Sequence, residues 1–146
     1  MGLLGAARRR LETIPVPDDE HVFIHGDSWL GNTVWTAENE LSGMIDWDAA
    51  GAGAAGIDLG SLRFDVTVLY GAAASDEVVH GWEVASGRPA VNLAYWEVVA
   101  ESCTTADTSP CVPTLQELGR TDLNAALLQV RRDEFLACAL ERLERN

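Results

Sequence analysis

Two short polar motifs, each placed directly after an apolar run, constrain the possible folds of this chain more than any other feature. Residues 25–32 read HGDSWLGN, of the form H-x-D-x-x-x-x-N, and they follow the apolar residues 22–24. Residues 44–48 read MIDWD, so Asp46 comes at the end of a second apolar run. Short apolar runs that end in polar residues are typical of strands in a small sheet. We therefore expect the carboxylates and the amide of both motifs to lie at one mouth of that sheet.

The remaining pattern predicts an α+β fold in which this small β-hairpin region packs on a mostly helical bundle. Short strands are expected at 22–24, 33–35 and 41–47, with a turn at 38–40. Helical patterns occupy 2–13, 59–70, 75–86 and 90–103, and a last helix starts near residue 121 and buries Leu123, Leu127, Val130, Leu136, Leu140 and Leu143. Residues 104–113 are expected to form a surface loop. At 146 residues the chain fits a single domain, 1–146.

The charge of the chain limits the partners that it can have. Its formal net charge is -13, and all ten basic side chains are arginines. Nucleic acid and anionic membranes are therefore not expected as partners, whereas a cationic small molecule would be attracted. We expect no signal peptide and no membrane span. The three cysteines fit neither a disulfide framework nor a zinc site, so we expect free thiols in a reducing cytoplasm.

The two motifs together have the side chains that phosphoryl transfer requires. Asp27 can accept a hydrogen bond from an attacking hydroxyl and then its proton. Asn32 and Asp46 offer the hard oxygen ligands that Mg²⁺ prefers, and Asp48 is a further candidate ligand. We expect His25 to hold the loop through hydrogen bonds in its neutral form, and Gly31 to ease a tight turn.

These residues resemble the aminoglycoside phosphotransferase and choline kinase family, which are small-molecule kinases with a protein-kinase-like fold. The resemblance rests on residues 23–32, on GMIDWD at 43–48 and on GIDL at 56–59. It implies that Asp27 is the catalytic aspartate, that Asn32 and Asp46 bind the metal and nucleotide, and that Asp58 ties the following helix to the catalytic loop. It also implies Mg²⁺ as cofactor, ATP or GTP as phosphate donor, and a small hydroxyl compound as acceptor.

The resemblance covers the C-terminal lobe of that fold, because only about twenty residues precede the first predicted strand and no lysine is present to hold the nucleotide phosphates. We expect the N-terminal nucleotide lobe to be absent, so the chain is incomplete alone or works with a partner chain. Acidic side chains after residue 58 are the candidates for binding the acceptor: Asp65, Asp76, Glu83, Glu97 and Glu101.

Four other interpretations stay open. The run GAGAAG at 51–56 has the G-x-G-x-x-G form of a dinucleotide site, although a flexible loop of small residues is the preferred interpretation. Gly26-Asp27-Ser28 resembles the nucleophile block of G-D-S esterases, with Ser28 as nucleophile and His80 as the only later histidine. Asp46 and Asp48 also fit a phosphatase-type pair, but that chemistry normally needs a lysine. Finally, the chain could be a catalytically inactive binding module.

Overall fold

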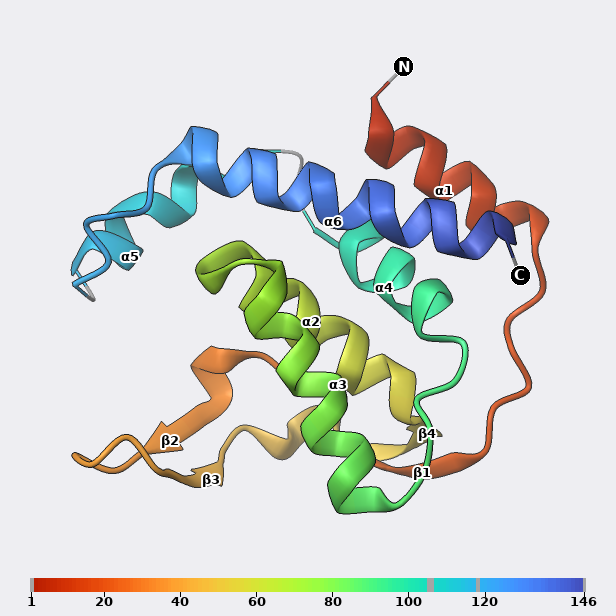
Figure 1. Cartoon of the computed structure of the whole chain (residues 1–146), viewed down its shortest axis with the longest axis horizontal. Coiled ribbons are helices and arrows are strands. Elements are labelled where there is room, and N and C mark those ends of the chain that lie inside the picture. Colours follow the sequence, from red (N-terminus) through yellow and green to blue (C-terminus); the bar gives the residue numbers. More distant parts are fainter. Residues whose placement is uncertain (1, 105–106, 118, 146) are drawn as a thin grey trace.

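The computed structural model describes residues 2–104, 107–117 and 119–145 and shows a mostly helical α+β protein (Figure 1). The helices are α1 (Leu3–Thr13), α2 (Ala55–Tyr70), α3 (Ala72–Ser86), α4 (Leu93–Ser102), α5 (Val112–Glu117) and α6 (Ala125–Arg145). The strands are β1 (His21–Ile24), β2 (Thr33–Trp35), β3 (Leu41–Met44) and β4 (Gly51–Ala54). Short 3-10 turns lie at Leu30–Asn32, Trp47–Ala49 and Ser109–Cys111.

The strands form two separate antiparallel pairs instead of the single hairpin sheet that the sequence predicts. β2 and β3 form the expected hairpin, with Thr33 opposite Met44, but β1 pairs with β4, with Ile24 opposite Gly51. The run at 51–56 is therefore a strand and the start of α2, and the expectation of a flexible loop was wrong. Ladder hydrogen bonds use only backbone groups, so a run of small residues can pair when a partner strand is at hand.

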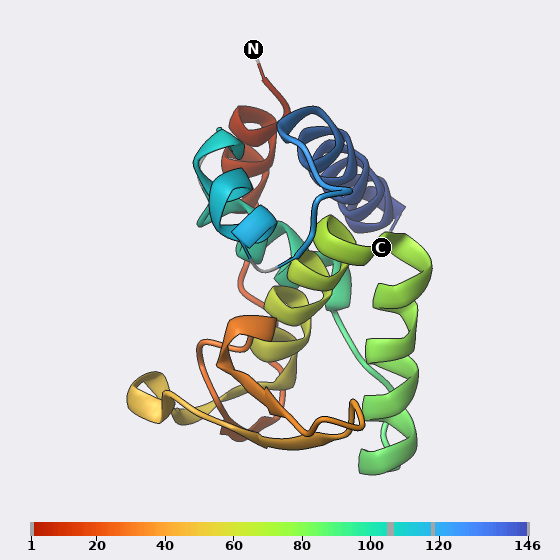
Figure 2. The same ribbon diagram turned by 90° about the vertical axis from the view of Figure 1, so that its left-hand side faces the viewer.

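Helix α2 runs through the middle of the molecule, between the strand pairs and helices α1, α4 and α6, and α3 lies alongside it (Figures 1 and 2). Its first half lies very close to α4, because two glycines one turn apart face Trp96. A Cβ atom at Gly56 would lie 2.0 Å from Trp96 Cδ1, and one at Gly60 would lie 2.6 Å from the Trp96 carbonyl oxygen. Neither glycine can therefore be replaced without moving α4. The indole Nε1 of Trp96 in turn donates a hydrogen bond to Asp19, at 2.7 Å.

Helices α1, α4 and α6 enclose an apolar core on the other side of α4. Its fully buried members are Ala7, Val98, Leu136 and Ala139. Partly buried leucines of α1 and α6 pack around them: Leu3, Leu4, Leu11, Leu140 and Leu143. Two predictions for the last helix were wrong, since Leu123 is buried but precedes α6, and Val130 is 52% exposed.

Buried ion pairs join α2, α4 and α6. Glu97 on α4 is fully buried between Arg63 of α2, whose Nε lies 2.7 Å from Oε1, and Arg142 of α6. Burial raises the pKa of Glu97, and the two arginines oppose that rise. One turn later Glu101, also fully buried, lies 3.3 Å from Arg132 Nε. Removing an arginine partner of Glu97 would leave a buried charge with less compensation, so the contacts of Glu97 fix the three helices relative to one another.

No helix in the described ranges is both long enough and apolar enough to cross a membrane.

Candidate active site

The loop that follows β1, residues 25–32, is held in place by the first turn of α2. The Asp58 carboxylate accepts hydrogen bonds from two consecutive backbone N–H groups, that of His25 at 2.7 Å and that of Gly26 at 2.9 Å. Both amides come directly after the last residue of β1, and β4 leads directly into α2. The pairing of β1 with β4 therefore brings Asp58 to the start of the loop.

The His25 ring joins the two sequence motifs. It is buried, its Nε2 donates to the Ile45 carbonyl oxygen at 2.8 Å, and its Nδ1 accepts from the Asp27 N–H at 3.3 Å. These partners assign a neutral imidazole with its proton on Nε2. Because both ring nitrogens are engaged with backbone groups, His25 is not free to move a proton, and its place in the structure is that of a brace between the motifs. The Trp47 ring packs against it, with centroids 4.5 Å apart.

Asp27 and Asn32 lie side by side, although four residues of the loop separate them. The buried Asn32 side chain donates from Nδ2 to the Asp27 carbonyl oxygen at 2.9 Å and to Asp27 Oδ2 at 3.1 Å. Two acceptors on one side fix the orientation of the amide, so Asn32 Oδ1 faces away from Asp27. The described residues give Oδ1 no hydrogen bond, whereas the Asp27 side chain is exposed. Asp27 thus presents a carboxylate to solvent, and Asn32 keeps one oxygen for a ligand.

The second motif lies next to the first because the residue that follows β3 bonds to the backbone of Asn32. The Ile45 N–H donates to the Asn32 carbonyl oxygen at 2.9 Å, and Asp46 follows directly. Asp46 then adopts φ 61° and ψ 61°, a left-handed conformation that costs a non-glycine residue about 1 kcal/mol. The strand thus ends at Met44, three residues before the predicted boundary. Backbone of this kind is enriched at functional sites, so the conformation of Asp46 is consistent with a functional side chain.

The acidic side chains of the second motif are available to a cation. Asp46 and Asp48 are both exposed, and no described residue gives either carboxylate a hydrogen bond or an ion pair. The described residues contain no group of three His, Cys, Asp or Glu side chains that could hold a metal by themselves. Mg²⁺ is usually held by one or two carboxylates together with waters and substrate phosphates, so Asn32 Oδ1 and the Asp46 carboxylate fit its chemistry.

Two glycines shape the loop in different ways. Gly26 has φ +83°, and a Cβ atom there would lie 2.3 Å from the Ala49 carbonyl oxygen, so both the conformation and the space require glycine. Gly31 has an ordinary φ, and a Cβ atom there would meet the Trp29 ring at 2.1 Å. Gly31 therefore makes room for an indole, and the glycine that the backbone turn needs is Gly26.

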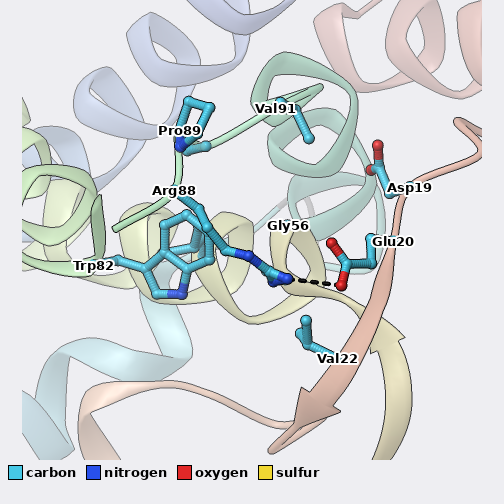
Figure 3. A pocket seen from close by; sticks show the side chains of 11 residues that line it. Asp19, Glu20, Val22, Gly56, Trp82, Arg88, Pro89 and Val91 are labelled. Atoms are coloured by element: carbon cyan, nitrogen blue, oxygen red, sulfur yellow. Dashed lines mark ion pairs between the residues drawn. The ribbon is translucent and has the colours of Figure 1, made fainter. Parts of the chain in front are cut away.

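A cavity of about 220 Å³ lies between β1, the start of α2 and the end of α3 (Figure 3). The Arg88–Glu20 ion pair, with N and O 2.7 Å apart, crosses it, and Trp82 lies along it (Figure 3). A second cavity of about 190 Å³ shares the Trp82 wall and is also lined by Ser28 and Asp58. Each is smaller than a typical ligand pocket, which is about 300–1,000 Å³, whereas the two together fall within that range.

The five acids considered as acceptor ligands are all engaged within the protein. Glu97 and Glu101 belong to the buried ion pairs, and Asp76 pairs with Arg63 at 3.3 Å. Glu83 accepts the Ala90 N–H at 2.9 Å, and Asp65 accepts the Leu30 N–H at 2.8 Å. The contact between Asp65 and the loop is the feature that the sequence analysis missed. Its only signal is the spacing of seven residues from Asp58, which places both acids on one face of a helix.

The structure gives no support to the esterase and dinucleotide interpretations. Ser28 is buried and, within the described ranges, makes no hydrogen bond to a histidine, while His80 is exposed on α3. Gly51 and Gly53 lie inside β4, which is antiparallel to β1. A dinucleotide site needs its glycines in the turn between a parallel strand and a helix.

Comparison with known proteins decides the family. The model of the phosphotransferase enzyme family matches residues 3–100, which is more than half of the chain and includes both motifs and the whole of α2. The chain belongs to the phosphotransferase enzyme family. Neither the curated proteins nor the solved structures contain a match. For this phosphotransferase, the family assignment agrees with the resemblance that the two motifs indicate.

Proposed function

We propose that this phosphotransferase carries the catalytic side chains for Mg²⁺-dependent transfer of the γ-phosphate of ATP or GTP to a hydroxyl group of a small molecule. The observation that carries the proposal is the pairing of Asp27 with Asn32. Asn32 Nδ2 donates to Asp27 Oδ2 at 3.1 Å, which leaves the second Asp27 oxygen free for a hydroxyl and Asn32 Oδ1 free for a cation. Phosphoryl transfer depends mostly on placement and on neutralising charge, so a few fixed oxygens suffice.

In this proposal each side chain has a distinct task. Asp27 accepts a hydrogen bond from the acceptor hydroxyl, orients it and takes up its proton as the bond between the acceptor oxygen and the γ-phosphorus forms and the nucleoside diphosphate leaves with the bridging oxygen. Asn32 and Asp46 hold Mg²⁺, with Asp48 as a further ligand, and the ion supplies positive charge to the nucleotide phosphates. Asp58 and His25 keep the loop in place through backbone hydrogen bonds.

The surface around these residues suits a covering partner. Large apolar side chains are exposed along residues 23–47: Phe23, Trp29, Val34, Trp35, Leu41, Ile45 and Trp47. Apolar surface of this extent around polar groups favours a site that a base, an acceptor or another folded unit covers. We propose that this fold is the C-terminal lobe of a kinase-like enzyme and that a nucleotide lobe, on the same or another chain, covers this face. The acceptor is a neutral or cationic alcohol, in keeping with the net charge of -13, and the reaction takes place in the cytoplasm.

Binding tests the metal site without requiring turnover. Mn²⁺, which broadens nearby NMR signals, should broaden the Asn32 side-chain amide and the Asp46 backbone amide, and Mg²⁺ should compete with it. Asp46→Asn should weaken this broadening at least tenfold, whereas Asp18→Asn, which changes an exposed acid outside the loop, should leave it unchanged. Absence of broadening at millimolar Mn²⁺ would favour the inactive binding module.

Turnover tests the catalytic assignment. In an enzyme complete with a nucleotide lobe, Asp27→Asn should reduce kcat by at least a hundredfold, because general base catalysis contributes about 10²–10⁴-fold. Circular dichroism should show an unchanged fold, since the amide introduced at position 27 still offers an oxygen to Asn32. Near-normal turnover would reject Asp27 as the base.

A further inference from the structure

We propose that Asp65 is a positioning residue, which holds the 3-10 turn Leu30–Asn32 so that Asn32 stays beside Asp27. The contact itself is independent of the reaction, while its consequence for metal binding rests on the function proposed above.

The turn is fixed through both polar groups of Leu30. Its N–H donates to Asp65 Oδ2 at 2.8 Å. Its carbonyl oxygen accepts from the Thr33 hydroxyl at 2.6 Å and from the Thr33 N–H that ends the turn. The Leu30 N–H is bonded to α2, and the Leu30 carbonyl oxygen is bonded to the start of β2. The peptide groups of Leu30 therefore cannot rotate without losing hydrogen bonds on both sides.

A short series of contacts leads from Leu30 to the reactive carboxylate. The Asn32 N–H closes the turn on the Trp29 carbonyl oxygen at 3.0 Å. The Asn32 side chain then donates to the Asp27 carbonyl oxygen and to Oδ2. Displacing Leu30 would therefore move the Asn32 side-chain amide, whose Oδ1 is the proposed metal ligand, and would weaken the hydrogen bond that orients the Asp27 carboxylate.

Asp58 and Asp65 together hold the two ends of the loop from one face of α2. Seven residues of α-helix make about two turns and a rise of about 10 Å, so both side chains point the same way. Asp58 holds residues 25 and 26, and Asp65 holds residue 30. The middle of the loop, with the exposed Asp27, is left to face a substrate.

The environment of Asp65 indicates that this carboxylate has a specific task. It is partly buried and, within the described ranges, has no ion-pair partner. Burial raises the pKa of Asp65, and the hydrogen bond from Leu30 lowers it only in part. A carboxylate that loses water without gaining a cation is normally costly. The gain that offsets this cost in the structure is the fixed amide of Leu30.

NMR of the whole chain tests the inference. In the wild type, the Leu30 amide shift should follow the titration of Asp65. Asp65→Ala should speed hydrogen exchange at Leu30 at least tenfold beyond any change in global exchange and should shift the Asn32 side-chain amide signals. Asp65→Asn, which keeps an acceptor oxygen, should restore slow exchange and abolish the titration of the Leu30 shift. Glu83→Ala removes a similar carboxylate contact, to the Ala90 N–H, and should change neither signal.

The outcomes separate this inference from the proposed function. The inference would be overturned if the Leu30 amide chemical shift did not follow the titration of Asp65. It would also be overturned if Asp65→Ala changed neither the hydrogen exchange of Leu30 nor the Asn32 side-chain signals. If Mn²⁺ reaches Asn32 equally well in the wild type and in Asp65→Ala, the metal site stands and positioning by Asp65 fails. If Asp65→Ala disturbs Asn32 but the wild type binds no Mn²⁺, the positioning role stands and the proposed function fails.

Discussion

Replacing Glu101 with Gln should remove a large part of the pH dependence of stability. The Glu101 side chain is fully buried on α4, and burial raises its pKa to about 8, with the Arg132 ion pair opposing that rise. In the unfolded chain the group should titrate near its usual value of 4.5. Between these values the folded state holds a proton that the unfolded state has released. The free energy of unfolding therefore falls as pH rises, by about 1.4 kcal/mol per pH unit.

The stability linked to Glu101 is fully present below pH 4.5 and is lost as pH rises towards about 8. The loss over this interval is at most about 5 kcal/mol, comparable with the whole stability of a small domain. Gln has a similar shape and no charge, and Arg132 keeps its ion pair with Asp133 at 2.9 Å. The difference in unfolding free energy between the variant and the wild type should therefore grow in favour of Glu101→Gln as pH rises.

Urea unfolding followed by tryptophan fluorescence from pH 5 to 8.5 measures this difference. The control is Glu141→Gln, which changes an exposed acid on α6 and should follow the wild type at every pH. Parallel curves for the wild type and Glu101→Gln would show that Glu101 does not hold its proton in the folded protein, and the argument from burial would be refuted.

Three further substitutions test the packing and backbone conformation of the fold, each by thermal and urea unfolding. Gly26→Ala should lower the free energy of unfolding by about 2–4 kcal/mol, because φ is +83° and the new Cβ would lie 2.3 Å from the Ala49 carbonyl oxygen; a cost under 1 kcal/mol would contradict this. Gly81→Ala, in an open position inside α3, should instead raise it by about 0.5–1 kcal/mol, and a loss would show a hidden contact. Trp96→Phe removes the donor to Asp19 and should cost about 1–3 kcal/mol, whereas an unchanged midpoint would mean that water replaces it.

Much of the secondary structure could be predicted because it follows local patterns. The helix ends at Gly71 and Gly87 and the hairpin from β2 to β3 follow from apolar spacing and turn residues. The start of α3 was placed at residue 75, but the helix begins at Ala72, directly after Gly71. The predicted start of α6, near residue 121, is in contrast about four residues too early. Local signals fix an element more securely than its boundaries.

Contacts between distant segments could not be predicted in the same way. The pairing of β1 with β4 depends on backbone groups, and nothing in a run of glycine and alanine indicates a partner. The acids of the helices were candidates for binding the acceptor, because nothing local in the sequence shows that their arginine and backbone partners come from other helices and loops. For the site, the sequence drew attention to the residues around Asp27, Asn32 and Asp46. The hydrogen bond that Asp65 accepts from the Leu30 N–H, 35 positions earlier, has no signal in the sequence except the spacing of seven residues between Asp58 and Asp65.

The two acids of α2 make the number of residues between them more constrained than their identity. One residue inserted or deleted between positions 58 and 65 would turn the later acid by about 100° around the helix axis and shift it by about 1.5 Å along it. The loop would then be anchored at one end only, even with every side chain of both motifs intact. Active members of a lineage built on this arrangement should therefore tolerate length changes in the turn at 38–40 but none within this stretch of α2.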